Sequence, residues 1–355
     1  MRHRCLRIKA GTFALLSAAT GLFAVGLLSP FNVHAQSKTP SVVASIKPIH
    51  SLVSNVMSGI GKPGIIIAGG ASPHTFSMRP SKAKLLSKAD IVFWVGDEME
   101  TFLIKPLNTL NKKAAIVPLS KAPGVRLLKA RLGGMWEEHL HEEGRHDSHG
   151  HDSHGHGGHV HDHDKNDQKN SHDKHKGEDS HGEFNMHVWL GRANAIAMVR
   201  TVVKTLSKKD KTNASRYKKN GERTIERINK AYSSINQDLA PVKKVPFLVF
   251  HDAYPYFEKD TGLTAVGSIS TQTARKPGAK RLYEIRRKIV SLGVKCIFAE
   301  PQFEPKLIKA ITEGTNAKTG ILDPLGAALK TGPEAYFQLI ENLSKNLKTC
   351  LSQTS

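Results

Sequence analysis

The sequence predicts an α/β protein of two lobes, each a mostly parallel sheet flanked by helices, joined by one long connecting helix. Short apolar runs of strand length alternate with helical segments in both halves of the chain. A strongly charged helical stretch separates the halves, and a histidine-rich stretch at 136–183 interrupts the first. Parallel strands need a long return connection, which a helix supplies, so this alternation favours parallel sheets over hairpins.

The first 35 residues have the three parts of a secretory signal peptide. Basic residues precede an apolar run at 11–28, and the small-residue sequence Val33-His34-Ala35 follows it. We expect cleavage after Ala35 and export of the mature protein. No later stretch approaches the ~18 apolar residues of a membrane span, so the mature protein is expected to be soluble.

The N-terminal lobe is expected at 36–208. Its predicted strands are 41–49, 65–68, 91–95 and 115–119, and its predicted helices are 50–59, 81–88, 98–110 and 191–206. The run at 91–95 is apolar throughout, as is typical of a parallel strand that is covered on both faces. Ligands of such lobes bind at loops that follow the carboxyl ends of strands.

The stretch at 136–183 is expected to be a disordered, metal-binding loop of this lobe. It holds thirteen of the nineteen histidines among Asp, Glu, Gly and Ser, with too little hydrocarbon to offset the entropy of ordering. Imidazole is a good ligand for Zn, Cu and Ni. The predicted auxiliary metal ligands are His149, His151, His154, His156, His159, His161 and His163. The alternative is a solvated tract without a metal role.

The connecting helix is expected at 209–240 and the C-terminal lobe at 241–355. Ile225, Ile228, Tyr232 and Ile235 give the helix an apolar stripe at three- and four-residue spacing, and Pro241 ends it. The strands predicted for the second lobe are 247–250, 263–268, 296–299 and 319–322. Its predicted helices are 253–259, 278–291, 304–315 and 333–347.

Charge and cysteine content bound the function further. Removing the four basic residues of the leader lowers the net charge from +21 to +17. Export and the lack of a basic motif interleaved with aromatic residues argue against nucleic acid as a partner. We also expect the protein to be a monomer.

Cys296 and Cys350 are the cysteines left after processing. An oxidising compartment favours a disulfide between them, with two buried free thiols as the alternative.

Outside the loop, His74, His187 and His251 each lie beside a predicted strand. Converging on one cleft, they would supply a tetrahedral Zn²⁺ with three nitrogens at about 2.0–2.1 Å. The fourth position stays open to Glu300, Asp323 or water. Because imidazole must be neutral to bind metal, affinity should weaken below its ordinary pKa of ~6.5. A zinc enzyme is the rival class, but the sequence has no His-Glu-x-x-His helix and no general base is assigned.

Four motifs carry a family resemblance: 71–81 (ASPHTFSMRPS), 184–190 (FNMHVWL), 250–254 (FHDAY) and 322–326 (LDPLG). Together they resemble the motif set of the ZnuA family, the periplasmic zinc receptors of ABC importers, over nearly the whole mature chain. The resemblance implies zinc held between two lobes and delivered to a membrane permease driven by an ATPase. It also implies that Cys296 and Cys350 are paired.

By the same resemblance, the ligands are His74, His187 and His251, with Asp323 or water as the fourth. Some zinc receptors of the family have Glu before the first histidine, where this chain has Pro73. The similar manganese receptors carry a carboxylate at the place of His251, so His251 favours zinc, as nitrogen ligands do in general. The alternatives are a receptor for manganese or another divalent metal, and a zinc buffer or adhesin without a transporter.

Overall fold

The computed structural model describes residues 39–131, 136, 182–269, 278–302 and 305–353. The predicted signal peptide and the seven auxiliary loop histidines lie outside the described residues. Among the described helices, none combines the length and apolar character needed to cross a membrane.

The first sheet contains four parallel strands in the order β2-β1-β3-β4. They are β1 (Val42–Ile46), β2 (Gly64–Ile67), β3 (Ile91–Trp94) and β4 (Ala115–Pro118). Every residue of the central strands β1 and β3 is buried. The continuous apolar runs therefore form strands because helices cover both faces of the sheet.

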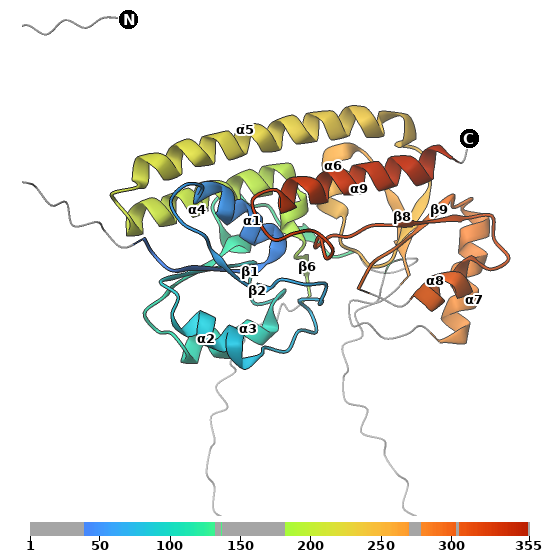
Figure 1. Ribbon diagram of the computed structural model, residues 1–355. Coiled ribbons are helices and arrows are strands. Elements are labelled where there is room, and N and C mark those ends of the chain that lie inside the picture. Colours follow the sequence, from blue (N-terminus) through green and yellow to red (C-terminus); the bar gives the residue numbers. More distant parts are fainter. Residues whose placement is uncertain (1–38, 132–135, 137–181, 270–277, 303–304, 354–355) are drawn as a thin grey trace, which may run out of the picture. The chain divides into compact units, whose positions relative to one another are not determined.

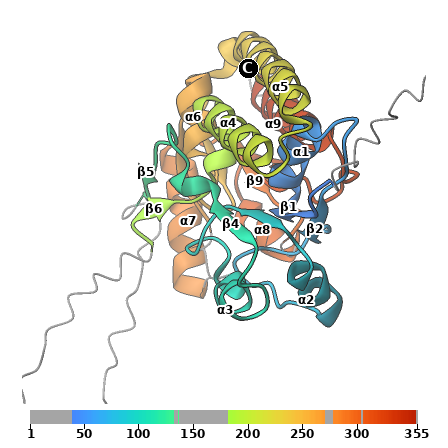
Figure 2. The same ribbon diagram turned by 90° about the vertical axis from the view of Figure 1, so that its left-hand side faces the viewer.

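Helices lie on both faces of this sheet (Figure 1, Figure 2). α1 (Lys47–Val56) and α4 (Arg192–Lys209) lie on one face, and α2 (Pro80–Ser87) and α3 (Thr101–Thr109) on the other. α1 begins three residues earlier than predicted. Its first turn contains Pro48, where the missing N–H would have no helical partner in any case.

A short antiparallel pair, β5 (Leu128–Lys129) with β6 (Phe184–Asn185), was not predicted. We call it the β5–β6 arm. The 3-10 turns η1 (Leu119–Lys121) and η2 (Val188–Leu190) precede β5 and follow β6. Two-residue strands carry no periodicity, and these two pair across the histidine-rich stretch, so sequence patterns could not reveal them.

The long helix α5 (Ala214–Leu239) packs along α4 and along α9 (Ala335–Ser352) (Figure 1). Its buried residues include Tyr217, Ile228, Tyr232, Ile235 and Leu239. Gly221 permits the close packing on α4, since a Cβ there would lie 2.4 Å from the Val203 side chain. The turn η3 (Ala240–Val242) ends the helix at Pro241.

The second sheet is also parallel, in the order β10-β9-β7-β8. Its strands are β7 (Phe247–Val249), β8 (Ala265–Ser268), β9 (Cys296–Ala299) and β10 (Lys318–Ile321). The remaining helices are α6 (Pro255–Thr261), α7 (Ala279–Ser291) and α8 (Pro305–Thr312). Counted from the start of each lobe, both sheets have the order 2-1-3-4. The predicted fold class is confirmed.

Cys296 and Cys350 form a disulfide, with their Cα atoms 6.2 Å apart. The bond ties β9, a central strand of the second sheet, to the last helix α9. Both cysteines are buried. The predicted pairing is therefore confirmed.

Replacing both cysteines, as Cys296→Ser with Cys350→Ser, should lower the free energy of unfolding by about 4 kcal/mol. The bond closes a loop with a sequence separation of 54, which restricts the unfolded chain. Thermal and urea unfolding of oxidised wild type and the variant measure the loss. Metal affinity is the internal control, because neither cysteine contacts the predicted site. A variant as stable as wild type would contradict the expectation.

Candidate metal centre

The structure brings the three predicted histidines together. His74 lies in the loop between β2 and α2, His187 directly before η2, and His251 two residues after β7. One ligand atom from each of His74, His187 and His251 lies within 4.8 Å of the others. The ring centroids are 5.0 to 6.4 Å apart. Segments from both halves of the chain thus converge on one place.

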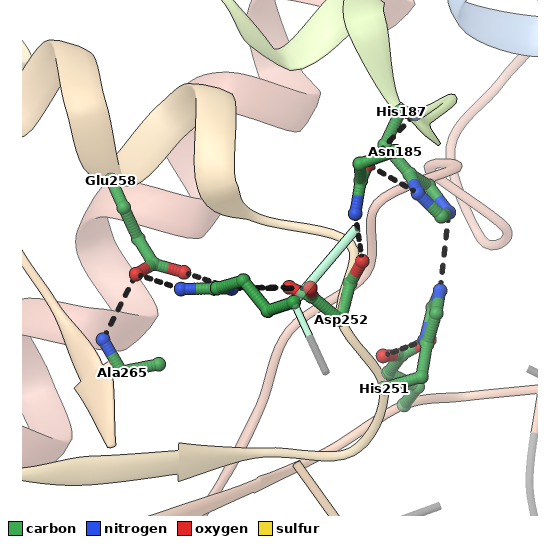
Figure 3. A network of polar contacts seen from close by, with 8 residues as sticks. Asn185, His187, His251, Asp252, Glu258 and Ala265 are labelled. Atoms are coloured by element: carbon green, nitrogen blue, oxygen red, sulfur yellow. Dashed lines mark hydrogen bonds and ion pairs between the residues drawn. The ribbon is translucent and has the colours of Figure 1, made fainter. Parts of the chain in front are cut away.

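Two of the rings are oriented through their Nδ1 atoms (Figure 3). The Nδ1 atom of His187 lies 3.1 Å from the side-chain oxygen of Asn185, and that of His251 lies 2.6 Å from Glu300 Oε1. An amide or carboxylate oxygen can only accept, so each Nδ1 carries the proton. The two Nε2 atoms, 3.1 Å apart, are then the nitrogens that can bind a metal.

His74 supplies the third nitrogen. Its Nε2 atom is buried and has no hydrogen-bond partner among the residues that the structure describes. A buried polar atom is rarely left in this state, because it loses its bond to water and gains nothing in return. Beside two other imidazoles, this unpartnered nitrogen fits a metal ligand better than a structural role.

Burial keeps the rings of His74 and His187 neutral. It lowers the pKa of His74 to about 4, with a further lowering by His251. Burial lowers the pKa of His187 still more strongly, and the two neighbouring imidazoles add to the effect. A metal therefore displaces few protons from these two rings near pH 6. The sequence-based expectation of weakening just below pH 6.5 shifts to lower pH, because free imidazole is the wrong reference.

The two carboxylates predicted for the fourth position have different surroundings. Asp323 is not part of the three-histidine group. Its oxygens accept backbone N–H bonds from Leu325, Gly326 and Ala327 at 2.5 to 3.1 Å, and a bond from the Gln302 amide. Glu300 contacts His251 directly. The structure therefore places Glu300, rather than Asp323, against a predicted ligand.

The loop at residues 322–329, called the Asp323 loop, also binds Lys47. The buried ammonium group of Lys47, just after β1, donates to the carbonyl oxygens of Gly326, Ala327 and Leu329 at 2.6 to 2.8 Å. Burial lowers the pKa of Lys47, and the charge of Asp323 opposes this. The loop thereby joins the first sheet to the second lobe.

Sequence reasoning missed the residues that support the histidines. Asn185 holds His187, and its amide donates to the carbonyl oxygen of Asp252, next to His251. Asp252 in turn pairs with Arg131. The motif containing His187 includes Asn185, which is the one available signal. Nothing in the sequence around Arg131 points to this role.

Two parallel α/β lobes bridged by a long helix, with three imidazoles converging from both halves, define a two-lobed metal receptor. The chain belongs to the family described as zinc-uptake complex component A, periplasmic (ZnuA), whose model matches residues 42–350. It is 50% identical over 312 residues to the high-affinity zinc uptake system protein ZnuA of Brucella suis biovar 1 (strain 1330). That match covers 88% of this chain and 92% of the relative.

More distant similarities agree. The high-affinity zinc uptake system protein ZnuA of Yersinia pestis is 34% identical over 331 residues, covering 92% of this chain and 94% of the relative. A crystal structure of ZnuA superimposes with a TM-score of 0.67 at 17% identity, covering 88% of this chain and all of that one. FpvC from Pseudomonas aeruginosa in complex with Mn²⁺ has a TM-score of 0.69 at 18% identity, covering 90% and 100%. These two structures share the fold.

The depressed pKa of His74 predicts a pH-dependent stability of the metal-free protein. The unfolded chain takes up a proton near pH 6.5 and the folded one only near 4, so the unfolding free energy should fall as pH drops between these values. The contribution of His74 is about 1–3 kcal/mol. Urea unfolding in chelator from pH 7.5 to 4.5 measures it.

The control for this experiment is His74→Asn, which cannot take up the proton. Glu100, whose pKa burial raises to about 7, titrates with the opposite sign in both proteins and cancels in the difference. That difference reports His74 together with its effect on the pKa of His187. Wild type should lose more stability than the variant on acidification. Parallel pH profiles would show that His74 is not held neutral by the fold.

Proposed function

We propose that this protein is a zinc receptor that binds one Zn²⁺ through His74, His187 and His251 and delivers it to the permease of an ABC importer. The observation that carries the proposal is the convergence of three imidazoles within 4.8 Å. The pKa values of His74 and His187 are lowered, so both rings are neutral at physiological pH. The relatives named as zinc uptake proteins support the choice of cargo.

The chemistry of the donors supports zinc over harder ions. Neutral imidazole nitrogen suits Zn²⁺, whereas Mn²⁺ prefers carboxylate and carbonyl oxygen. A structural zinc site is closed by four protein ligands, but cargo must leave, so three nitrogens and one exchangeable position suit a receptor. The hydrogen bonds that Asp323 already accepts favour water at that position over Asp323.

We also propose binding and release, without catalysis, as the whole activity. Glu300, the carboxylate against His251, accepts hydrogen bonds from His251 and from the Tyr254 hydroxyl. Those bonds orient a ligand and leave this carboxylate poorly placed to take a proton from a substrate.

The proposal further includes export by residues 1–35, a monomer, and the lobe boundaries 36–208, 209–240 and 241–355.

The histidine-rich stretch has an auxiliary role in this proposal. Many imidazoles along one polar segment, among them His149 to His163, can bind several ions, each more weakly than a preformed site. Such a segment would capture zinc when it is scarce and pass it to the three-histidine centre.

Deleting residues 138–181 should leave one tight zinc site, and adding His187→Ala should remove it. The deletion takes away the multiple weak sites, while the substitution removes a nitrogen that is held in place by Asn185. Calorimetric titration of wild type, the deletion and the double variant gives stoichiometry and affinity.

His50→Ala is the matched control, because His50 is also buried but lies outside the three-histidine group. Its Nε2 donates to the carbonyl oxygen of Pro63, and its Nδ1 lies 3.4 Å from the Ser54 hydroxyl. It should leave zinc affinity within about threefold, well inside the factor of ten that 1.4 kcal/mol represents. Competition with Mn²⁺ tests the cargo. A deletion variant without a tight site would assign zinc binding to the histidine-rich stretch and contradict the proposal.

The fourth position is tested by comparing Glu300→Gln with Asp323→Asn. If Glu300 orients His251 and water is the ligand, Glu300→Gln should weaken zinc binding by about 10- to 100-fold. Asp323→Asn should then change it by less than about fivefold, since no metal bond is lost. A larger loss for Asp323→Asn would make Asp323 the fourth ligand, as the family resemblance allows.

A further inference from the structure

We propose that Arg131 is a positioning residue that holds His187 and His251 in their ligand geometry by fastening the β5–β6 arm to the start of α6. This inference rests on the proposed function, in which both histidines bind zinc. Arg131 lies two residues after β5 in the first half of the chain, and its partners lie beyond the connecting helix α5.

The Arg131 guanidinium forms hydrogen bonds with two carboxylates of the second lobe at once. Its Nε atom lies 3.1 Å from both carboxylate oxygens of Asp252, and its two terminal nitrogens each lie 2.9 Å from an oxygen of Glu258. A terminal nitrogen also bonds Asp252. The side chains of Asp252 and Glu258 are only 9% and 7% exposed. Arginine alone has the planar fork that can serve two carboxylates in this way.

Asp252 links the bonds of Arg131 to His187 and His251 (Figure 3). It directly follows His251, so its position sets the start of the turn that carries that ring. Its backbone carbonyl accepts the amide N–H of Asn185, whose oxygen holds the ring of His187. One residue therefore lies on the path to His187 and on the path to His251, whose Nε2 atoms are 3.1 Å apart.

A second bond ties the arm to α6 without Arg131. The hydroxyl of Tyr256 accepts the N–H of Leu128 at 2.9 Å and donates to the carbonyl of Asn185 at 2.5 Å. Both strands of the arm are thus attached to α6. Because Tyr256 keeps the arm in place, a variant of Arg131 should fold, while the Asp252 turn loses its restraint.

Removing the guanidinium would leave two nearly buried carboxylates close together without a cation. Like charges in a poorly solvated place repel each other, and this repulsion moves the Asp252 turn. The pKa of Arg131 is lowered by burial but raised overall by its bonds to Asp252 and Glu258, so the cation is permanent. Its guanidinium carbon lies 3.6 Å from the centre of the Trp136 ring, which covers it.

The chain supplies a matched control in Arg227. This arginine also bonds both oxygens of one carboxylate, Glu334, and its guanidinium carbon lies 3.7 Å from the ring centre of Phe337. It joins α5 to the start of α9 and belongs to no contact of the histidines. The same substitution at both positions therefore compares two stacked, paired arginines that differ in their link to the site.

The experiment compares Arg131→Met and Arg227→Met in the full mature chain. Arg131→Met should weaken the tightest zinc site by about 10- to 100-fold, the usual effect of losing a residue that supports a ligand. Zinc release into excess chelator should be faster by a similar factor. The visible spectrum of the protein with one equivalent of Co²⁺ should change, because ligand geometry sets it. Arg131→Lys, which restores the charge without the fork, should recover only part of the affinity.

Arg227→Met should lower thermal stability but leave zinc affinity, release and the Co²⁺ spectrum as in wild type. If Arg131→Met does not fold, Asp252→Asn replaces it, since that variant keeps the Arg131–Glu258 bonds and the backbone carbonyl. A folded Arg131→Met or Asp252→Asn protein with wild-type affinity, release and spectrum would overturn the inference alone. If tight zinc binding survives His187→Ala in the full mature chain, the proposed function is overturned, and this inference with it.

Discussion

The arrangement depends on one constraint, that three imidazole rings must lie side by side in a largely desolvated place, where burial lowers the pKa of His74 and of His187. Charged imidazoles at this separation would repel one another, and burial penalises the charge as well. The fold meets the constraint by giving the Nδ1–H groups of His187 and His251 an acceptor each, Asn185 and Glu300. Both Nε2 atoms then face the same place, and the unpartnered Nε2 of His74 lies with them.

The two parallel sheets explain how distant segments reach this place. In a sheet of order 2-1-3-4, the connections diverge between the first and third strands, which leaves a crevice at their carboxyl ends. In the second lobe those strands are β7 and β9, and they are followed by His251 and Glu300. In the first lobe the equivalent strand β1 is followed by Lys47, which donates to the Asp323 loop. The same edge of each sheet therefore faces the other lobe.

Several buried polar bonds between the halves keep this edge in register. Lys47 reaches the carbonyl groups of the Asp323 loop, Arg131 reaches Asp252 and Glu258, and the indole N–H of Trp189 donates to the carbonyl of Pro324. The bonds of Lys47 and Trp189 are buried and those of Arg131 are partly buried, so breaking one would leave a poorly solvated group without its partner. These bonds hold the two halves together around the three histidines.

Local patterns in the sequence determined the strands of the two four-stranded sheets, most of the helices, the long helix and the choice of His74, His187 and His251. These features depend on apolar periodicity and on short motifs, which are properties of neighbouring residues. Tertiary structure alone decided the β5–β6 arm, the pairing of His251 with Glu300 and the ion pair of Arg131 with Asp252. Those partners are 49 and 121 residues apart. No periodicity reaches across such separations, because the contacts exist only once both sheets have packed and brought their carboxyl ends together.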